Sequence, residues 1–262
     1  MLKRHRSGNP ALSEVKIFGE RNTGTRVLRT LLESIPGITV LPSTAKELDG
    51  DAYWAVQSLD QQAISREAAI DQIFEGRSPR ETWKHCATEF DAIEDFGGCV
   101  ILITVKNPAS WLVSLRRRPY HALSKPPENL GEFLRFQWKT VRRERLKEQS
   151  FTPLKLYNAK INSYFRMIEQ LRQASIPCRF LRFEDLVLNQ EREFRALAAL
   201  VGAQMLPFAP VEQSTKSSEL RLEYYRDYYG KERWREDLVG FESAINREVE
   251  WDQLSAFGYE PV

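Results

Sequence analysis

The residues best suited to chemistry begin at a loop bracketed by Gly19 and Gly24, which follows a short β-rich run and precedes a segment with helical apolar spacing. Its glycines permit a tight turn, its backbone N–H groups can converge on an anion, and a helix N-terminus adds partial positive charge. The glycine spacing is that of a Walker A loop, but Thr25 replaces the lysine and Arg26 replaces the magnesium-binding hydroxyl. The loop therefore predicts an anion site and argues against an ordinary magnesium ATPase. The alternative is a glycine turn that only packs a helix on a strand.

A second candidate group follows the strongest predicted strand, residues 99–105. Lys106 leaves the end of this strand, and Ser114 lies about two turns into the predicted helix that begins at Pro108. Both side chains can reach one edge of a ligand that crosses the strand ends, and a cation with a hydroxyl suits a phosphate. The alternative is a solvated lysine and a serine that binds nothing.

The elements that must position these residues alternate between strand-like and helix-like patterns. Such alternation predicts an α/β fold with a mostly parallel sheet, helices on both faces, and ligands at the carboxyl ends of the strands. Strands are expected at residues 15–18, 38–41, 99–105 and 178–183, with a strand end at 81–85; helices are expected at 25–34, 61–74, 108–115, 130–147, 157–171 and 191–201 and in a last segment up to Phe257.

Composition places the 262-residue chain among ordinary globular proteins, with 42% hydrophobic and 28% charged residues. Its 38 Lys and Arg against 36 Asp and Glu leave a net charge of +2, too near neutral for coating a nucleic acid, so we expect no nucleic-acid partner. No apolar run has the length of a membrane span. Cys86, Cys99 and Cys178 lack paired spacing and are typical of free thiols in a reducing compartment, which predicts a cytoplasmic location.

No internal repeat or linker marks a domain boundary, and we predict one domain over residues 1–262. Residues 1–13 are expected to form a flexible tail. The basic residues there are followed by no apolar segment of the kind that a secretory signal carries. Residues 43–80 carry no motif and are interpreted as a variable insert.

Three segments together resemble the sulfotransferase family: GERNTGTRVL at the glycine loop, VKNPASWLVSL after the central strand, and RFLRFEDLVLNQEREFRALAALVG further on. The resemblance spans roughly residues 15–202. It implies a P-loop NTPase-like three-layer α/β fold and the sulfuryl donor 3′-phosphoadenosine 5′-phosphosulfate (PAPS), which leaves as 3′-phosphoadenosine 5′-phosphate (PAP). It also implies that Lys106 and Ser114 bind the 3′-phosphate. The loop residues implied for the 5′-phosphosulfate end are Arg21, Asn22, Thr23, Gly24, Thr25 and Arg26.

The run Trp83-Lys84-His85 fits the same resemblance, because family members often carry a catalytic Lys and His at a strand end between the two phosphate motifs. Sulfuryl transfer to a hydroxyl needs a base for the acceptor proton and cations for charge on the sulfuryl and leaving oxygens. Imidazole titrates in the range for such a base, and an ammonium can follow the negative charge without a metal. We expect His85 to be the general base and Lys84 its electrostatic partner; the alternative is a structural histidine.

One departure from the family pattern is Asn22, which stands where many members carry a lysine or arginine. Either Arg21, Arg26 or Lys84 supplies the charge, or the protein is a slow or inactive relative. Two other functions stay open: a nucleotide-binding relative without turnover, and a phosphotransferase that uses ATP with magnesium. The acceptor implied by the resemblance is hydroxylated, with carbohydrates and small metabolites as the expected classes.

Other conspicuous side chains are interpreted as structural. Glu184 and Asp185 follow a predicted strand, where adjacent side chains point to opposite faces, so a joint acid–base role is not expected. Trp83, Trp111 and the tyrosines at 224–229 are assigned to the core. The clustered arginines are expected on solvated helix faces interleaved with Glu144 and Glu148; they are Arg116, Arg117, Arg118, Arg142, Arg143 and Arg145.

Overall fold

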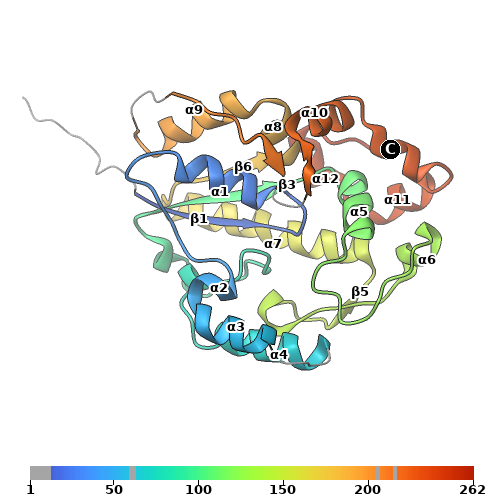
Figure 1. Cartoon of the computed structure of the whole chain (residues 1–262), viewed down its shortest axis with the longest axis horizontal. Helices are drawn as coiled ribbons and strands as arrows, with labels where there is room; N and C mark the ends of the chain where they lie inside the picture. Colours follow the sequence, from blue (N-terminus) through green and yellow to red (C-terminus); the bar gives the residue numbers. More distant parts are fainter. Residues whose placement is uncertain (1–12, 59–62, 204–206, 215–216) are drawn as a thin grey trace, which may run out of the picture.

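The computed structural model describes residues 13–58, 63–203, 207–214 and 217–262. Its centre is a four-stranded sheet in the order β2-β1-β3-β6, and each neighbouring pair is parallel (Figure 1). Gly19 pairs with Thr104, so β1 and β3 end side by side. The parallel sheet, with its central apolar strand inside it, is confirmed. The strands are β1 (Glu14–Gly19), β2 (Thr39–Val40), β3 (Cys99–Val105) and β6 (Cys178–Arg182).

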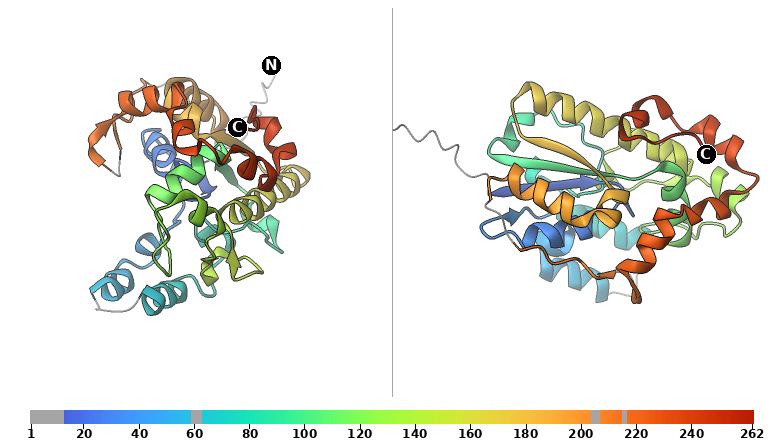
Figure 2. Two further views of the ribbon diagram at one scale, coloured as in Figure 1. Left: turned by 90° about the vertical axis from the view of Figure 1, so that its right-hand side faces the viewer. Right: turned by 90° about the horizontal axis from the view of Figure 1, so that it is seen from above.

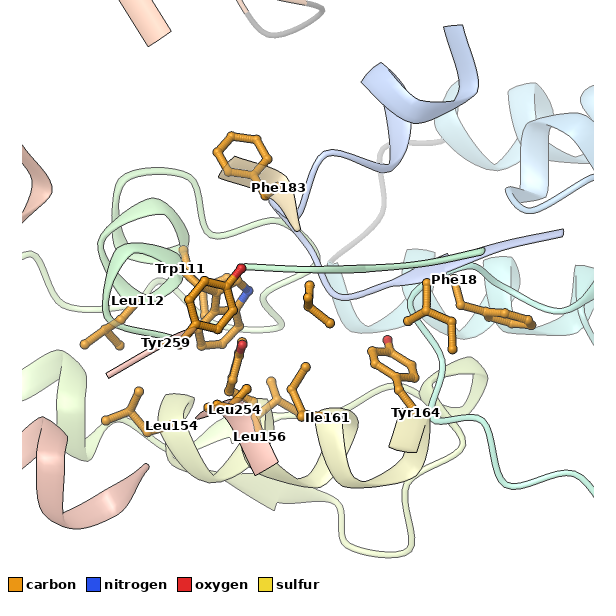
Figure 3. Packing of buried hydrophobic residues seen from close by; sticks show 14 of the residues in the cluster. Phe18, Trp111, Leu112, Leu154, Leu156, Ile161, Tyr164, Phe183, Leu254 and Tyr259 are labelled. Carbon is orange, nitrogen blue, oxygen red and sulfur yellow. The ribbon is translucent and has the colours of Figure 1, made fainter. Parts of the chain in front are cut away.

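Helices cover both faces of the sheet. Successive side chains of β3 point to opposite faces, and every one of them is buried. Val100 and Leu102 pack with α1 and α9 on one face, whereas Ile101 and Ile103 pack with α7 on the other. Figure 3 shows the second face, where apolar side chains of α7 point toward the strands. The predicted layered α/β fold is confirmed. These helices are α1 (Thr25–Glu33), α7 (Pro153–Gln173) and α9 (Gln190–Leu200).

The helix after the central strand begins as its sequence predicts. Pro108 occupies its first turn, where a missing N–H costs nothing. The Asn107 side-chain oxygen caps it by accepting from the backbone N–H groups of Ala109 at 3.0 Å and Ser110 at 3.2 Å. This cap fixes the direction in which the helix leaves the sheet edge. The helices that directly follow β3 and β6 are α5 (Pro108–Arg117) and α8 (Phe183–Leu188).

The segment interpreted as an insert, residues 43–80, folds into short helices with a small apolar cluster of their own. They lie on the far side of the molecule from the C-terminal helices (Figures 1 and 2). The helix predicted at 61–74 is confirmed from Ala63, while residues 61–62 lie outside the described part, as does the predicted tail up to residue 12. The variability of the insert stays a prediction. Its helices are α2 (Ala45–Leu48), α3 (Gly50–Ser58) and α4 (Ala63–Ile73).

The prediction of one helix over residues 130–147 is wrong. The helix ends at Arg135, because Trp138 enters a two-stranded antiparallel ladder opposite Phe151 and is fully buried there. The chain then turns so that Arg143 and Glu144 point inward rather than to solvent. The elements are α6 (Leu130–Arg135), β4 (Trp138–Lys139), a 3₁₀ turn (Arg142–Glu144) and β5 (Ser150–Phe151).

The C-terminal part forms short elements that pack beside α5 and α8. The last helix expected before Phe257 is split into two short helices and a 3₁₀ turn. No helix in the described ranges is both long and apolar enough to cross a membrane. The remaining elements are β7 (Gln213–Ser214), β8 (Ser217–Arg221), α10 (Leu222–Gly230), α11 (Glu242–Glu248), α12 (Trp251–Leu254) and 3₁₀ turns at Pro79–Glu81, Ile93–Phe96, Arg233–Leu238 and Ser255–Phe257.

Candidate active site at the carboxyl edge of the sheet

The glycine loop between β1 and α1 has a conformation that its two glycines make possible. Gly19 has φ +153°, and a Cβ there would lie 2.0 Å from the Thr104 Oγ1 on the neighbouring strand. Gly24 has φ +87°, and its Cβ would lie 2.9 Å from the Phe183 ring. Between them, Thr23 Oγ1 donates to the Glu20 carbonyl at 2.6 Å and lies 2.7 Å from Thr104 Oγ1. The loop is therefore packed tightly against the ends of β3 and β6.

The N-terminus of α1 is open toward this loop. Gly24 is its N-cap and supplies no side-chain cap, and no acidic residue stands in its first turn. The first backbone N–H groups of a helix have no intrahelical partner, and they carry partial positive charge. Thr25 is buried and Arg26 is exposed at this helix start. These features suit the binding of an anion.

Lys84 lies near the start of α1. Its backbone N–H donates to the Ser43 carbonyl at 3.1 Å, and its own carbonyl accepts from the Gly19 N–H at 2.9 Å. Burial lowers the pKa of Lys84 to about 8, Glu47 opposes this shift, and Arg26 and Arg29 add to it. In the described part of the chain, no carboxylate lies within ion-pair distance of the Lys84 ammonium. Lys84 is therefore a cation without a fixed counterion.

His85 is held against the first glycine of the loop. Its Nδ1 lies 2.5 Å from the Gly19 carbonyl oxygen, which can only accept, so Nδ1 carries the proton. Burial, followed by repulsion from Lys84, lowers the pKa of His85 well below its ordinary value. The imidazole is therefore neutral at pH 7, and its Nε2 lone pair is available to take a proton. The strand end predicted at 81–85 is wrong, because this segment is a 3₁₀ turn and a loop tied to β1 by the Gly19 bond.

The Arg21 guanidinium is paired with carboxylates in the protein interior. It is 1% exposed and lies between Glu20 and Glu144, at 2.8 and 2.7 Å. Lys160 completes the group, 3.0 Å from Glu144 and 3.6 Å from Glu20. We call these four residues the ion quartet. The Arg21 carbonyl accepts from the Trp111 indole N–H at 2.8 Å, so Trp111 is a core residue, as predicted, that also holds the loop.

Lys106 and Ser114 meet as predicted. The Lys106 ammonium donates to the Ser114 hydroxyl at 2.7 Å and to the Tyr229 hydroxyl at 2.8 Å. The Phe183 and Tyr229 rings lie 4.3 and 4.5 Å from the ammonium. Burial lowers the pKa of Lys106 to about 7, opposed by Glu184. We call Lys106, Ser114 and Tyr229 the Lys106 cluster.

Asn22 has the left-handed backbone conformation, with φ +63°. Asparagine adopts this conformation more readily than most other residues do. The residue that departs from the family pattern therefore has a local structural reason to stand in this turn.

The other polar residues behave largely as expected. Glu184 accepts from the Asn107 N–H at 3.1 Å and from the Tyr259 hydroxyl at 2.6 Å, and Asp185 pairs with Arg192 at 2.7 Å. Glu184 and Asp185 lie in the first turn of α8 rather than on extended chain, and both are tied to the fold. The two carboxylates therefore have structural partners, in agreement with the sequence interpretation.

The solvated position predicted for Arg143 and Glu144 is wrong. Arg143 is buried and pairs with Asp71 at 2.6 Å and with Glu67, while Glu144 belongs to the ion quartet. Both point inward because the helix expected around them does not form. By contrast, Arg116 and Arg117 pair with Asp237 in partly exposed positions.

Two hollows in the described part of the structure lie away from these residues. One, of about 320 Å³, runs along β6 between α9 and the 3₁₀ turn at Ser255–Phe257. The other, of about 560 Å³, lies between α3 and α4. Neither is lined by a residue of the loop, of the Lys106 cluster, or of the turn at residues 83–86, which we call the His85 turn.

Tyr229 and Lys160 were not assigned to the site by the sequence. Tyr229 was placed in the core with its neighbouring tyrosines, and its hydroxyl reaches Lys106 across 123 residues of chain. Lys160 lies within the amphipathic helix α7, and only the three-dimensional fold brings it to the His85 turn. No local sequence pattern marks either residue.

Comparison with known proteins gives structural similarities only. No family model matches the sequence, and no curated protein matches it. A sulfotransferase from Alicyclobacillus acidocaldarius is 16% identical, with a TM-score of 0.47 over 97% of each chain. The sulfotransferase domain from the curacin biosynthetic pathway is 15% identical, with a TM-score of 0.46 over 95% of this chain and 99% of that one.

A mouse sulfotransferase, SULT7A1, in complex with PAP is 14% identical, with a TM-score of 0.42 over 77% of this chain and 63% of that one. All three solved structures are described as sulfotransferases.

Proposed function

We propose that the protein transfers a sulfuryl group from PAPS to a hydroxyl group of an acceptor. The observation that carries this proposal is the arrangement at one sheet edge. Adjacent parallel strands β1 and β3 end with Gly19 beside Thr104. Lys106 directly follows β3, and Lys84 lies at the end of β1, where its carbonyl accepts from the Gly19 N–H at 2.9 Å. Both lysines are buried, and neither has an ion-paired carboxylate in the described part of the chain. Two such cations, Lys84 and Lys106, suit a ligand with phosphate groups at both ends.

The loop and the Lys106 cluster divide the binding of PAPS between them. The open start of α1, with the backbone from Asn22 to Arg26, binds the 5′-phosphosulfate end. Lys106 has three ammonium donors and uses two on Ser114 and Tyr229, which leaves one for the 3′-phosphate. The Tyr229 hydroxyl can turn toward the same group, and the Ser114 hydroxyl, which donates to the Ser110 carbonyl at 2.9 Å, can exchange that bond for one to the phosphate. The residues present therefore fit a nucleotide that carries a 3′-phosphate.

His85 and Lys84 provide the chemistry in this proposal. His85 Nε2 removes the proton from the acceptor hydroxyl, while its Nδ1–H stays bonded to Gly19. The acceptor oxygen forms the new bond to sulfur as the bond from sulfur to the donor's phosphate oxygen breaks. Lys84 stabilises the negative charge that develops on that leaving oxygen. Arg21 is given a positioning role, since its guanidinium is committed to carboxylates.

The acceptor class and the setting are part of the same proposal. Carbohydrates and small hydroxylated metabolites are the acceptors to screen first. The free cysteines Cys86, Cys99 and Cys178 are compatible with the proposed cytoplasmic location, where thiols stay reduced.

The test is PAPS turnover with a panel of hydroxylated acceptors, measured as release of PAP, for the wild type and His85→Asn. Asparagine places an amide N–H near the position of Nδ1 and removes the Nε2 base, so the bond to Gly19 is retained. Loss of a general base lowers the rate by about 10²–10⁴-fold. We expect that loss with unchanged PAP binding, whereas Lys147→Ala, at a lysine side chain that is 91% exposed, leaves both unchanged.

Two results would overturn the proposal. Binding and turnover of ATP with magnesium, without binding of PAP, would make the protein a phosphotransferase. Binding of PAP without turnover of PAPS by any acceptor, with His85→Asn indistinguishable from the wild type, would make it a non-catalytic nucleotide-binding relative.

A further inference from the structure

The ion quartet is an unusual group to find beneath a loop. Its four side chains, Glu20, Arg21, Glu144 and Lys160, are each at most 1% exposed, and they contain two cations and two carboxylates. Every cation contacts both carboxylates: Arg21 bonds Glu20 and Glu144, and Lys160 lies within 3.6 Å of the same two. The group has no net charge, and each of its two cations lies within ion-pair distance of both carboxylates.

The quartet draws its members from distant parts of the chain. Glu20 and Arg21 belong to the glycine loop, Glu144 to the 3₁₀ turn that follows β4, and Lys160 to the middle of α7. Three segments that are distant in the sequence are therefore joined by one group of charged side chains. Replacing buried ion groups with apolar residues is often neutral or stabilising, so a buried group of this kind is weak support for stability alone.

The quartet also contacts the turn that carries the proposed base. The Lys160 ammonium donates to the His85 carbonyl, and the Ala87 N–H donates to the Glu144 carbonyl at 2.7 Å. The His85 ring in turn donates to the carbonyl of Gly19, the residue before Glu20. The loop and the His85 turn are therefore joined both directly and through the quartet.

We propose that Lys160 and Glu144 are positioning residues, which hold the glycine loop and the His85 turn in one fixed relation and thereby keep the His85 Nδ1–H directed at Gly19. This inference rests on the proposed function for its catalytic meaning. It assigns a role to two buried residues that touch neither the donor nor the acceptor. It also explains why Arg21, although in the loop, faces inward: its guanidinium joins the loop to Glu144.

The test uses a charge-balanced double variant, Glu144→Gln with Lys160→Met, which removes one anion and one cation and leaves the Arg21–Glu20 pair neutral. Lys160→Arg is the conservative variant that retains the charge. Arg179→Met with Glu193→Gln is the matched control, since it removes another charge pair, 2.6 Å apart, from the β6–α9 side of the fold.

The first readout is ¹⁵N NMR of the His85 imidazole, which reports tautomer and titration without any turnover. The wild type and the control are expected to show the Nδ1–H tautomer and no titration near pH 6.5. In the double variant, we expect mixed tautomers of His85 and an imidazole titration that moves toward pH 6.5. In Lys160→Arg, we expect His85 to retain most of the tautomer and titration behaviour of the wild type.

The second readout is turnover of PAPS by the folded variants. A displacement of about 1 Å costs about 10²-fold in rate, so we expect the double variant to lose 10–100-fold in kcat with little change in PAP affinity. A folded double variant that keeps the wild-type His85 tautomer, titration and kcat would overturn the proposal. The quartet would then have a purely structural role. If that variant does not fold, Glu144→Gln with Lys160→Gln, which is also charge-balanced and keeps polar side chains at both positions, is judged by the same two criteria.

The NMR readout separates this inference from the proposed function. If the wild type turns over no PAPS while the tautomer and titration of His85 still depend on Lys160 and Glu144, the reaction assigned above fails and the positioning link stands. If PAPS is turned over and the tautomer and titration do not depend on them, the positioning link fails and the reaction stands.

Discussion

The ion quartet and the Lys106 cluster lie near the same sheet edge, and their buried cations have different partners. In the ion quartet, Arg21 and Lys160 are matched by two carboxylates at 2.7–3.6 Å. In the Lys106 cluster, the ammonium contacts two hydroxyls and two aromatic rings, and no carboxylate within ion-pair distance occurs in the described ranges. The first group has its charge neutralised within the protein, and the second does not.

The partners of a buried cation indicate whether its charge is available to a ligand. A buried cation with a carboxylate partner is already neutralised and serves to hold elements together. A buried cation that has only neutral partners retains a charge for which an anionic ligand is the natural counterion. By that criterion we propose a structural role for Arg21, the basic residue most prominent in the loop sequence, and ligand-binding roles for Lys84 and Lys106.

The largest expected effect is on stability. Lys160→Met leaves two buried carboxylates with one cation, so the free energy of unfolding should fall by about 3–5 kcal/mol. Lys106→Met leaves no ion-paired carboxylate behind and should change the free energy of unfolding by less than about 1 kcal/mol. Urea unfolding followed by circular dichroism at pH 7.5 measures both. Equal losses from the two variants would remove the distinction between the groups.

The next effect is the pH dependence of nucleotide binding. Burial lowers the pKa of Lys106 to about 7, so the free protein holds a cation there below pH 7 and loses it as the pH rises. Affinity for PAP should therefore fall above pH 7, by at most about tenfold per pH unit, because binding must first restore the proton. Calorimetric titrations between pH 6 and 9 measure this slope.

Lys106→Arg is the control for that slope, since a guanidinium stays protonated throughout this range. Its affinity should not fall between pH 7 and about 8, above which Lys84, with a pKa lowered to about 8, loses its own charge. A wild-type profile that is also flat between pH 7 and 8 would show that the Lys106 charge does not take part in binding.

The smallest effect concerns Tyr229, which lies 2.8 Å from the Lys106 ammonium through its hydroxyl. Tyr229→Phe keeps the ring and removes one hydrogen-bond partner, which is worth about 0.5–1.5 kcal/mol. We expect PAP affinity to fall by about 2–10-fold, while Tyr225→Phe in the same helix changes nothing. A larger loss from Tyr225→Phe would place the nucleotide elsewhere on α10.

Much of the fold follows from local sequence patterns. The apolar run at Cys99–Val105 predicts a central parallel strand because strands buried on both faces need apolar residues at every position. Pro108 marks the start of the next helix, and the spacing of the glycines marks the loop. The meeting of Lys106 with Ser114 follows from helix geometry and is confirmed at 2.7 Å.

What the sequence does not show are contacts between distant segments. Arg21 and Glu144 are 123 residues apart, as are Lys106 and Tyr229. The helix wrongly expected over 130–147 also concealed Glu144, because a helical pattern places that residue on a solvated face. The ladder of Trp138 with Phe151 overrides the helical pattern, and such tertiary pairing is invisible to a local reading.

A calorimetric comparison of PAP with AMP, which lacks only the 3′-phosphate, measures directly whether Lys106 binds that phosphate. If Lys106 is the unpaired cation for that phosphate, its charged hydrogen bond is worth about 1.5–3 kcal/mol. The wild type should then bind PAP about 10–100-fold more tightly than AMP, and Lys106→Met should lose most of that preference. Equal affinities in the wild type, or an undiminished preference for PAP in Lys106→Met, would show that Lys106 does not bind the 3′-phosphate.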